Sequence, residues 1–148
     1  MIYLLYQLRH GGWFREPWRA RVFGMLEERR IPAILSDVAG RRDVLHTRLT
    51  TPVAFVRFAG NDLHATDLPR LEAWVERLAD WTRAGVSSVF FFLHQPTEPY
   101  IVELAAHFIP ELERRLGVGL RAPREVEPLP KQGELFGGAA GAPPRFGS

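Results

Sequence analysis

The stretch Thr51-Pro52-Val53-Ala54-Phe55-Val56-Arg57-Phe58-Ala59-Gly60-Asn61 decides the fold of this chain. A proline precedes its apolar part, a glycine follows it, and the residues between are apolar except for one arginine. This pattern predicts a short buried β-strand whose successive side chains point to opposite faces of a sheet. The two faces consist of Val53, Phe55 and Arg57, and of Ala54, Val56 and Phe58. Because burying an unpaired charge is costly, the arginine predicts an ion pair or a wet cavity near the end of the strand.

Three further stretches, residues 3–10, 33–38 and 88–95, are also apolar at first and polar at the end. Each predicts a strand. Apolar residues recur at helical spacing between and after these strands, which predicts helices over residues 16–30, 66–85 and 98–116. We expect Pro110 to kink or interrupt the last of them. The alternation of strands and helices predicts an α/β fold with a parallel sheet of four strands.

The composition is that of a globular protein. The chain has 148 residues, of which 46% are hydrophobic and 24% charged, enough for one domain over residues 1–117. Residues 118–148 are rich in proline and glycine and predict a flexible tail.

The same composition excludes several classes of protein. The chain has no cysteine, which excludes a disulfide scaffold and a thiolate zinc site. No apolar run approaches the roughly 20 residues of a membrane span, and the N-terminus lacks the basic and cleavage regions of a signal peptide. We therefore expect a cytoplasmic protein without membrane contact. The net charge is only +2, so the local pairs Arg41-Arg42 and Arg114-Arg115 are interpreted as solvated surface charge.

Several motifs, in their order along the chain, resemble the YecE-like domain of unknown function. They are Leu8-Arg9-His10 with Trp13-Phe14, Ser36-Asp37, Gly40-Arg41-Arg42-Asp43, Leu49-Thr50-Thr51-Pro52, Phe55-Val56-Arg57-Phe58-Ala59-Gly60-Asn61 and Phe90-Phe91-Phe92-Leu93-His94-Gln95. The resemblance covers about residues 3–117 and implies a TIM-type (β/α)8 barrel, in a family without an established activity. The family usually has a glutamate at the position of Gln7. The glutamine of this chain cannot serve as the acid/base or metal-binding carboxylate that the resemblance would otherwise imply.

Length is the second departure from the family. A full barrel takes about 250 residues, and the motifs here are similar to those of its second half. The resemblance therefore implies a parallel four-stranded half-barrel. Such a half exposes two sheet edges and its inner face, so we expect a complement, which is either a separately encoded N-terminal half or a second copy in a homodimer. The alternative is an inactive, truncated half-barrel.

Polar residues at the ends of the four predicted strands form the candidate site, because strand-to-helix loops gather at the C-terminal ends of parallel strands. They are Gln7, Arg9, His10, Asp37, Arg57, Asn61, His94 and Gln95. We expect His94 to act as an acid/base catalyst oriented by Asp37, which also neutralises Arg57 or Arg9. The two arginines and the remaining polar groups are expected to bind a phosphate or carboxylate. Trp13 is a candidate for stacking on a substrate, or an aromatic lid over the core.

This pattern favours a site for an anion or phosphate, with hydrolysis or transfer on a phosphorylated or nucleic-acid substrate. The alternatives are a purely structural ion pair of Asp37 with an arginine and a structural His94. No cofactor and no metal is expected, since no His-x-x-x-His or Glu-x-x-His element is present. A mixed site of His10, Asp37 and His94 is the one metal-binding combination that the strand ends offer.

The tail contains a motif of another class. Lys131-Gln132-Gly133-Glu134-Leu135-Phe136 resembles the short peptide by which bacterial proteins bind the DNA sliding clamp. Gln132 would hydrogen-bond at the rim of a pocket that Leu135 and Phe136 fill. The alternative function is therefore a non-catalytic, nucleic-acid-associated module bound to the clamp through its tail, or the tail is inert.

Overall fold

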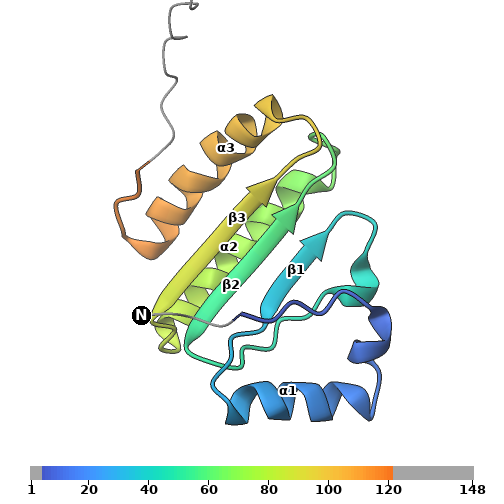
Figure 1. Cartoon of the computed structure of the whole chain (residues 1–148). Helices are drawn as coiled ribbons and strands as arrows, with labels where there is room; N and C mark the ends of the chain where they lie inside the picture. The colour runs from blue at the N-terminus through green and yellow to red at the C-terminus, as the bar shows by residue number, and fades with distance from the viewer. Residues whose placement is uncertain (1–4, 122–148) are drawn as a thin grey trace, which may run out of the picture.

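The structure is a computed structural model that describes residues 5–121. Its centre is a parallel sheet of three strands in the order β1 (Ile34–Val38), β2 (Val53–Ala59) and β3 (Ser88–His94) (Figure 1). The predicted strand in the opening stretch is therefore confirmed, as is the parallel direction of the sheet. β2 is the central strand, and its Arg57 lies opposite Ser36 on β1 and Phe92 on β3.

The fourth strand, predicted over residues 3–10, does not form within the described residues. Tyr6 makes a single parallel bridge with Ala33, and the Ile34 amide donates to the Tyr6 carbonyl at 2.9 Å. Within residues 5–121 this segment bridges to Ala33 alone, and the Arg9 carbonyl accepts from the Arg41 side chain. The chain then turns into the short 3-10 helix η1 (Gly11–Phe14).

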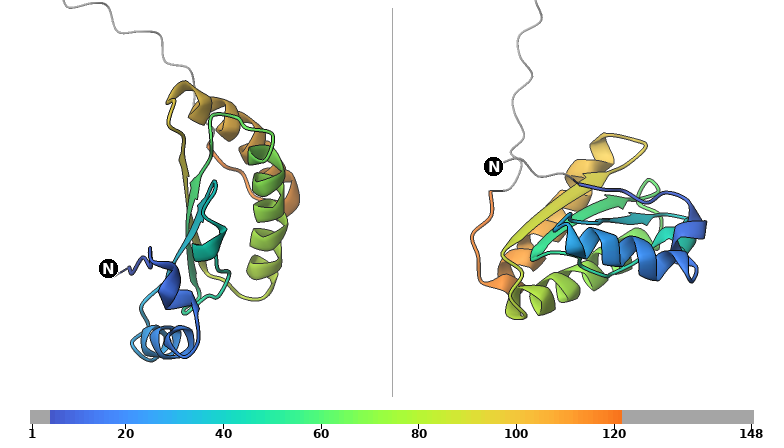
Figure 2. Two further views of the ribbon diagram at one scale, coloured as in Figure 1. Left: turned by 90° about the vertical axis from the view of Figure 1, so that its right-hand side faces the viewer. Right: turned by 60° about the horizontal axis from the view of Figure 1, so that its bottom comes forward.

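Helices α2 (Asp67–Arg83) and α3 (Pro99–Leu116) cover one face of the sheet (Figure 2). The alternation of β2 explains this contact, because Ala54, Val56 and Phe58 are fully buried against the helices. The side chains that form this main core are Leu35, Val56, Phe58, Leu71, Trp74, Val75, Leu78, Leu104, Phe108 and Leu112.

Helix α1 (Trp18–Glu28) lies at one end of the sheet, across the direction of the strands (Figure 1). It packs in a separate cluster, in which Phe23 and Leu26 contact Leu8 and Ala33. A second 3-10 helix, η2 (Arg42–Val44), follows β1. No helix among residues 5–121 is both long and apolar enough to cross a membrane.

The predicted interruption of the last helix at Pro110 is wrong, because α3 continues to Leu116. Pro110 lies on the exposed side of the helix, and the proline removes only one backbone hydrogen bond there. The buried residues Leu104, Phe108 and Leu112 hold the helix to the sheet on both sides of the proline. Gly117, with φ 67°, then ends it in the left-handed conformation.

The other face of the sheet is not covered by a helix within the described residues (Figure 2). On this face, Phe90 and Phe92 are 43% and 49% exposed. The sheet therefore has one apolar face that α2 and α3 cover and one open face. Most of the predicted tail, residues 122–148, lies outside the described residues.

Candidate functional site

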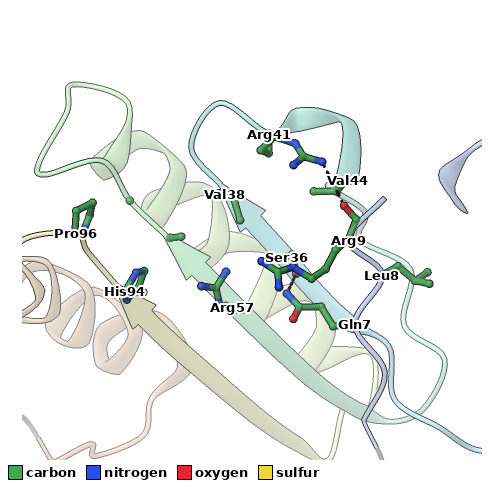
Figure 3. Close-up of a pocket in the computed structure, with 12 residues that line it drawn as sticks. Gln7, Leu8, Arg9, Ser36, Val38, Arg41, Val44, Arg57, His94 and Pro96 are labelled. Atoms are coloured by element: carbon green, nitrogen blue, oxygen red, sulfur yellow. Dashed lines mark hydrogen bonds between the residues drawn. The ribbon is translucent and has the colours of Figure 1, made fainter. Parts of the chain in front are cut away.

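A cavity of about 310 Å³ lies at the C-terminal ends of the strands, on the open face of the sheet (Figure 3). The first segment, β1, β2 and β3 all contribute to it. Its polar lining consists of Gln7, Arg9, Ser36, Arg41, Arg57 and His94. Four of the predicted site residues, Gln7, Arg9, Arg57 and His94, thus come together here.

The strand register explains this convergence. Ser36 is the Cα partner of Arg57, and His94 is the partner of Ala59, two residues further along β2. Because alternate residues share a face, Ser36, Arg57 and His94 all point to the open side. The Gln7 amide donates to the Ser36 hydroxyl at 2.8 Å and links the first segment to this row.

The cavity is cationic. No aspartate or glutamate is among its lining residues. Arg41 is already paired, since its guanidinium donates to the Asp43 carboxylate at 2.9 Å, and this hydrogen bond holds the pKa of Asp43 below its ordinary value. Half-buried Arg57 makes no ion pair and no side-chain hydrogen bond with any residue in the described part of the chain. The unpaired guanidinium is therefore the main charge of the site.

Asp37 does not belong to this cavity, which corrects the prediction. It follows Ser36 directly in β1, so its side chain points to the opposite, helix-covered face. There its carboxylate accepts from Trp74 Nε1 at 2.8 Å and from Arg70 Nη2 at 2.7 Å, and exposed Arg42 donates at 2.9 Å. Asp37 is thus not placed to orient His94 or to neutralise Arg57 or Arg9, and the alternative of a structural ion pair fits its surroundings.

Arg70, which was not among the predicted site residues, connects the strand ends on the helix-covered face of the sheet. Its guanidinium donates to the carbonyls of Asp37 and Ala59, both at 3.1 Å, and to the fully buried carboxylate of Asp67 at 3.2 Å. It therefore ties the C-terminal ends of β1 and β2 to α2. The sequence pattern that could have identified Arg70 is the spacing of Asp67, Arg70 and Trp74, which lie at i, i+3 and i+7 on one face of the helix.

Asn61 and Gln95 also lie outside the cavity. The Gln95 side chain is buried, and its carbonyl oxygen accepts from the Asp62 amide at 2.7 Å. The Asn61 amide donates to the Asp67 carboxylate at 2.8 Å. Gly60 permits this packing, since a Cβ there would lie 2.3 Å from Gln95 Nε2. Asn61 therefore belongs to the loop between β2 and α2, and Gln95, just after β3, supports that loop.

His10 and Trp13 line a separate, smaller hollow of about 220 Å³ together with Trp18. The His10 Nδ1 accepts from the Gly12 amide at 3.0 Å and so caps η1. Trp13 is 39% exposed and packs edge-to-face on Trp18. Neither residue reaches the cavity at the strand ends.

Two further predictions concern metal ions and the tail. Residues 5–121 contain no group of three or more histidine, aspartate or glutamate side chains placed to hold a metal ion. His10, Asp37 and His94 in particular lie in three different surroundings. The clamp-like residues Gln132, Leu135 and Phe136 lie outside the described residues, so that motif stays a prediction.

Residues 4–129 match a family described as "Protein of unknown function DUF72". The chain belongs to the DUF72 family. This confirms the resemblance to the YecE-like domain, which is the same family. No curated protein matches the chain.

Two crystal structures of a DUF72 family protein from Enterococcus faecalis V583 have a similar fold. The structure at 3.10 Å resolution superposes with a TM-score of 0.62 at 11% identity, over 85% of this chain and 52% of that one. The structure at 2.52 Å resolution gives a TM-score of 0.60 at 12% identity, over 80% and 50%. This DUF72 chain therefore spans about half the length of the structures that it matches.

Proposed function

We propose that the cavity at the strand ends binds an anion, and that its ligand is a phosphate or a phosphorylated molecule. The observation that carries this proposal is the unpaired, half-buried Arg57 in a cavity whose lining has no carboxylate. A partly desolvated guanidinium without a counter-ion is unfavourable, and an anion with two oxygen acceptors satisfies it in bidentate geometry.

The neighbouring groups support an anionic ligand. The Ser36 hydroxyl already accepts from Gln7, so its own proton is available for donation to a ligand oxygen. Arg9 lines the same cavity and adds a second positive charge. Donors thus outnumber acceptors among the polar side chains that line the cavity, as phosphate recognition requires.

His94 lines the same cavity at the end of β3 and is the candidate proton donor or acceptor. If a phosphorylated or nucleic-acid substrate reacts here, hydrolysis or transfer would use His94 as acid/base and Arg57 to stabilise charge on the phosphoryl oxygens. Since Asp37 lies on the other face, this chemistry has no carboxylate to orient His94. Binding is therefore the first part of the proposal, and catalysis the second.

Titration calorimetry with inorganic phosphate tests the binding. We expect Arg57→Ala to weaken phosphate binding by about 10- to 100-fold. This factor corresponds to the loss of about 1.5–3 kcal/mol, which is typical of a hydrogen bond to a charged group. The matched control is Arg83→Ala, which removes the same charge from an exposed position on α2. Equal affinities of the two variants would refute the site.

The catalytic part has its own readout. With p-nitrophenyl phosphate as a generic phosphoester, we expect His94→Ala to abolish turnover while phosphate binding persists.

The correspondence of this chain to the second half of its longer relatives is also part of our proposal, and the order of its motifs along the sequence supports it.

A further inference from the structure

The open face of the sheet carries three stacked phenylalanine side chains. Phe55 stacks on Phe90 and on Phe92, with ring centroids 5.9 and 4.7 Å apart. We call these three residues the aromatic face. Phe90 and Phe92 are 43% and 49% exposed, and within residues 5–121 no helix covers this face of the sheet (Figure 2). Contiguous exposed aromatic side chains of this kind mark an interaction surface.

The backbone at both edges of the sheet is also available. Among residues 5–121, β3 pairs with β2 alone, and the segment around Tyr6 makes one bridge, to Ala33. Free strand edges present rows of unpaired amides and carbonyls that pair readily with another strand. Further strands can therefore pair with the sheet at both of its edges. If the strands added at the two edges belong to one molecule, that molecule also covers the aromatic face.

We propose that a second copy of this chain covers the aromatic face. A two-fold axis parallel to the strands keeps every strand parallel, and it pairs β3 of each copy with the Tyr6 segment of the other. The two aromatic faces then pack against each other inside a closed parallel sheet, which has no free edge. The size of the arrangement is comparable with that of a similar crystal structure, of which one copy of this chain covers 52%.

The second copy also completes the cavity. Arg57 lies on the same side of the sheet as the aromatic face, two residues after Phe55. In the dimer, Arg57 and His94 of each copy face the same groups of the other across a narrow interior, and no carboxylate lines the cavity in either copy. Two guanidinium groups at close range repel each other unless an anion lies between them. Phosphate should therefore strengthen the dimer, a dependence that rests on the proposed function, whereas the dimer itself does not.

Light scattering after size-exclusion chromatography measures the mass of the full chain over a range of protein concentrations. We expect twice the monomer mass of 16.9 kDa. We expect Phe92→Glu to give a monomer with an unchanged far-ultraviolet circular dichroism spectrum. The double change Phe90→Ser and Phe92→Ser is a milder second variant in case the glutamate disturbs folding. The matched control is Val102→Glu, an equally drastic change at a side chain of α3 that is 58% exposed, and it should remain dimeric.

A wild-type monomer at every concentration, with or without phosphate, would overturn the proposal, and so would a dimer that persists in both phenylalanine variants. Phosphate that binds between the two arginines of the dimer and not to separate copies should tighten the dimer about tenfold by mass action when it is present at about ten times its dissociation constant, and this gain should be lost in Arg57→Ala. The two proposals fail separately. A dimer whose dissociation constant does not change with phosphate refutes only the proposal of an anion between the arginines. A monomer that binds phosphate refutes only the second copy and points to a different covering half.

Discussion

At the scale of the residue, the adjacent positions Ser36 and Asp37 serve opposite sides of one strand. Ser36 lies in the cavity beside Arg57, while Asp37 is 3% exposed among Trp74 and Arg70. The carboxylate therefore acts on the stability of the sheet, and the cavity keeps its positive charge.

Asp37→Ala should be strongly destabilising, because it leaves the 12% exposed guanidinium of Arg70 without its closest carboxylate. Breaking a buried ion pair in this way costs about 3–5 kcal/mol, which urea unfolding measures. Asp43→Ala, which breaks the exposed pair with Arg41, should leave the unfolding midpoint nearly unchanged. If the two variants unfold at the same urea concentration, the buried network is not what holds the strand ends.

At the scale of the element, each helix is held by its apolar face more than by its own backbone. α3 has buried residues on both sides of Pro110, and this packing outweighs the loss of one backbone hydrogen bond. α2 adds a polar contribution, since Arg70 and Trp74 bind the Asp37 carboxylate of β1 and Asp67 accepts from the Asn61 backbone amide just after β2.

Pro110→Ala should stabilise the protein by about 1–3 kcal/mol, because it restores a backbone donor within α3 and removes the clash of the ring with the preceding turn. Thermal unfolding followed by circular dichroism measures the change. Pro99→Ala is the control, since Pro99 stands at the first position of the same helix, where the missing amide has no partner to lose. An equal gain from both changes would show that unfolded-chain entropy, and not the helix, is responsible.

At the scale of the whole molecule, two apolar clusters are joined through the loop that precedes β2. His46 in this loop stacks on Phe14 and meets Phe23 edge-on, and its Nε2 lies 3.2 Å from the Ile34 carbonyl. The side chain therefore connects the α1 cluster to the sheet, and burial lowers its pKa below the ordinary value of 6.5.

The sign of the resulting pH dependence follows from the lowered pKa. The folded protein binds a proton at His46 less readily than the unfolded chain does, so its contribution is complete above about pH 6.5 and is lost progressively as the pH falls below that value. We expect the free energy of unfolding, from urea titrations at pH 7.5 and 5.5, to fall less in His46→Phe than in the wild type. His64→Phe, at an exposed position, should keep the wild-type slope. A slope unchanged in both variants would contradict this assignment.

Much of this molecule follows from sequence periodicity. The alternation in β2 places Arg57 with Val53 and Phe55 and opposite Val56 and Phe58 without any knowledge of the fold, and the burial pattern of that strand agrees. The spacing of apolar residues likewise locates the three helices, because both patterns depend on the local geometry of the backbone. The family motifs are also local in the sequence.

Only the tertiary structure decides which face of each strand becomes the cavity. Alternation separates Ser36 from Asp37 and His94 from Gln95, yet the functional face depends on where α2 and α3 pack, and these helices follow later in the chain. The reduction of the first predicted strand to the Tyr6 bridge has a similar origin, since strand pairing needs a partner that is distant in sequence. Sequence by itself therefore determined the three helices, three of the four predicted strands and the alternation of polar and apolar side chains along them, whereas long-range packing and pairing determined which polar residues meet.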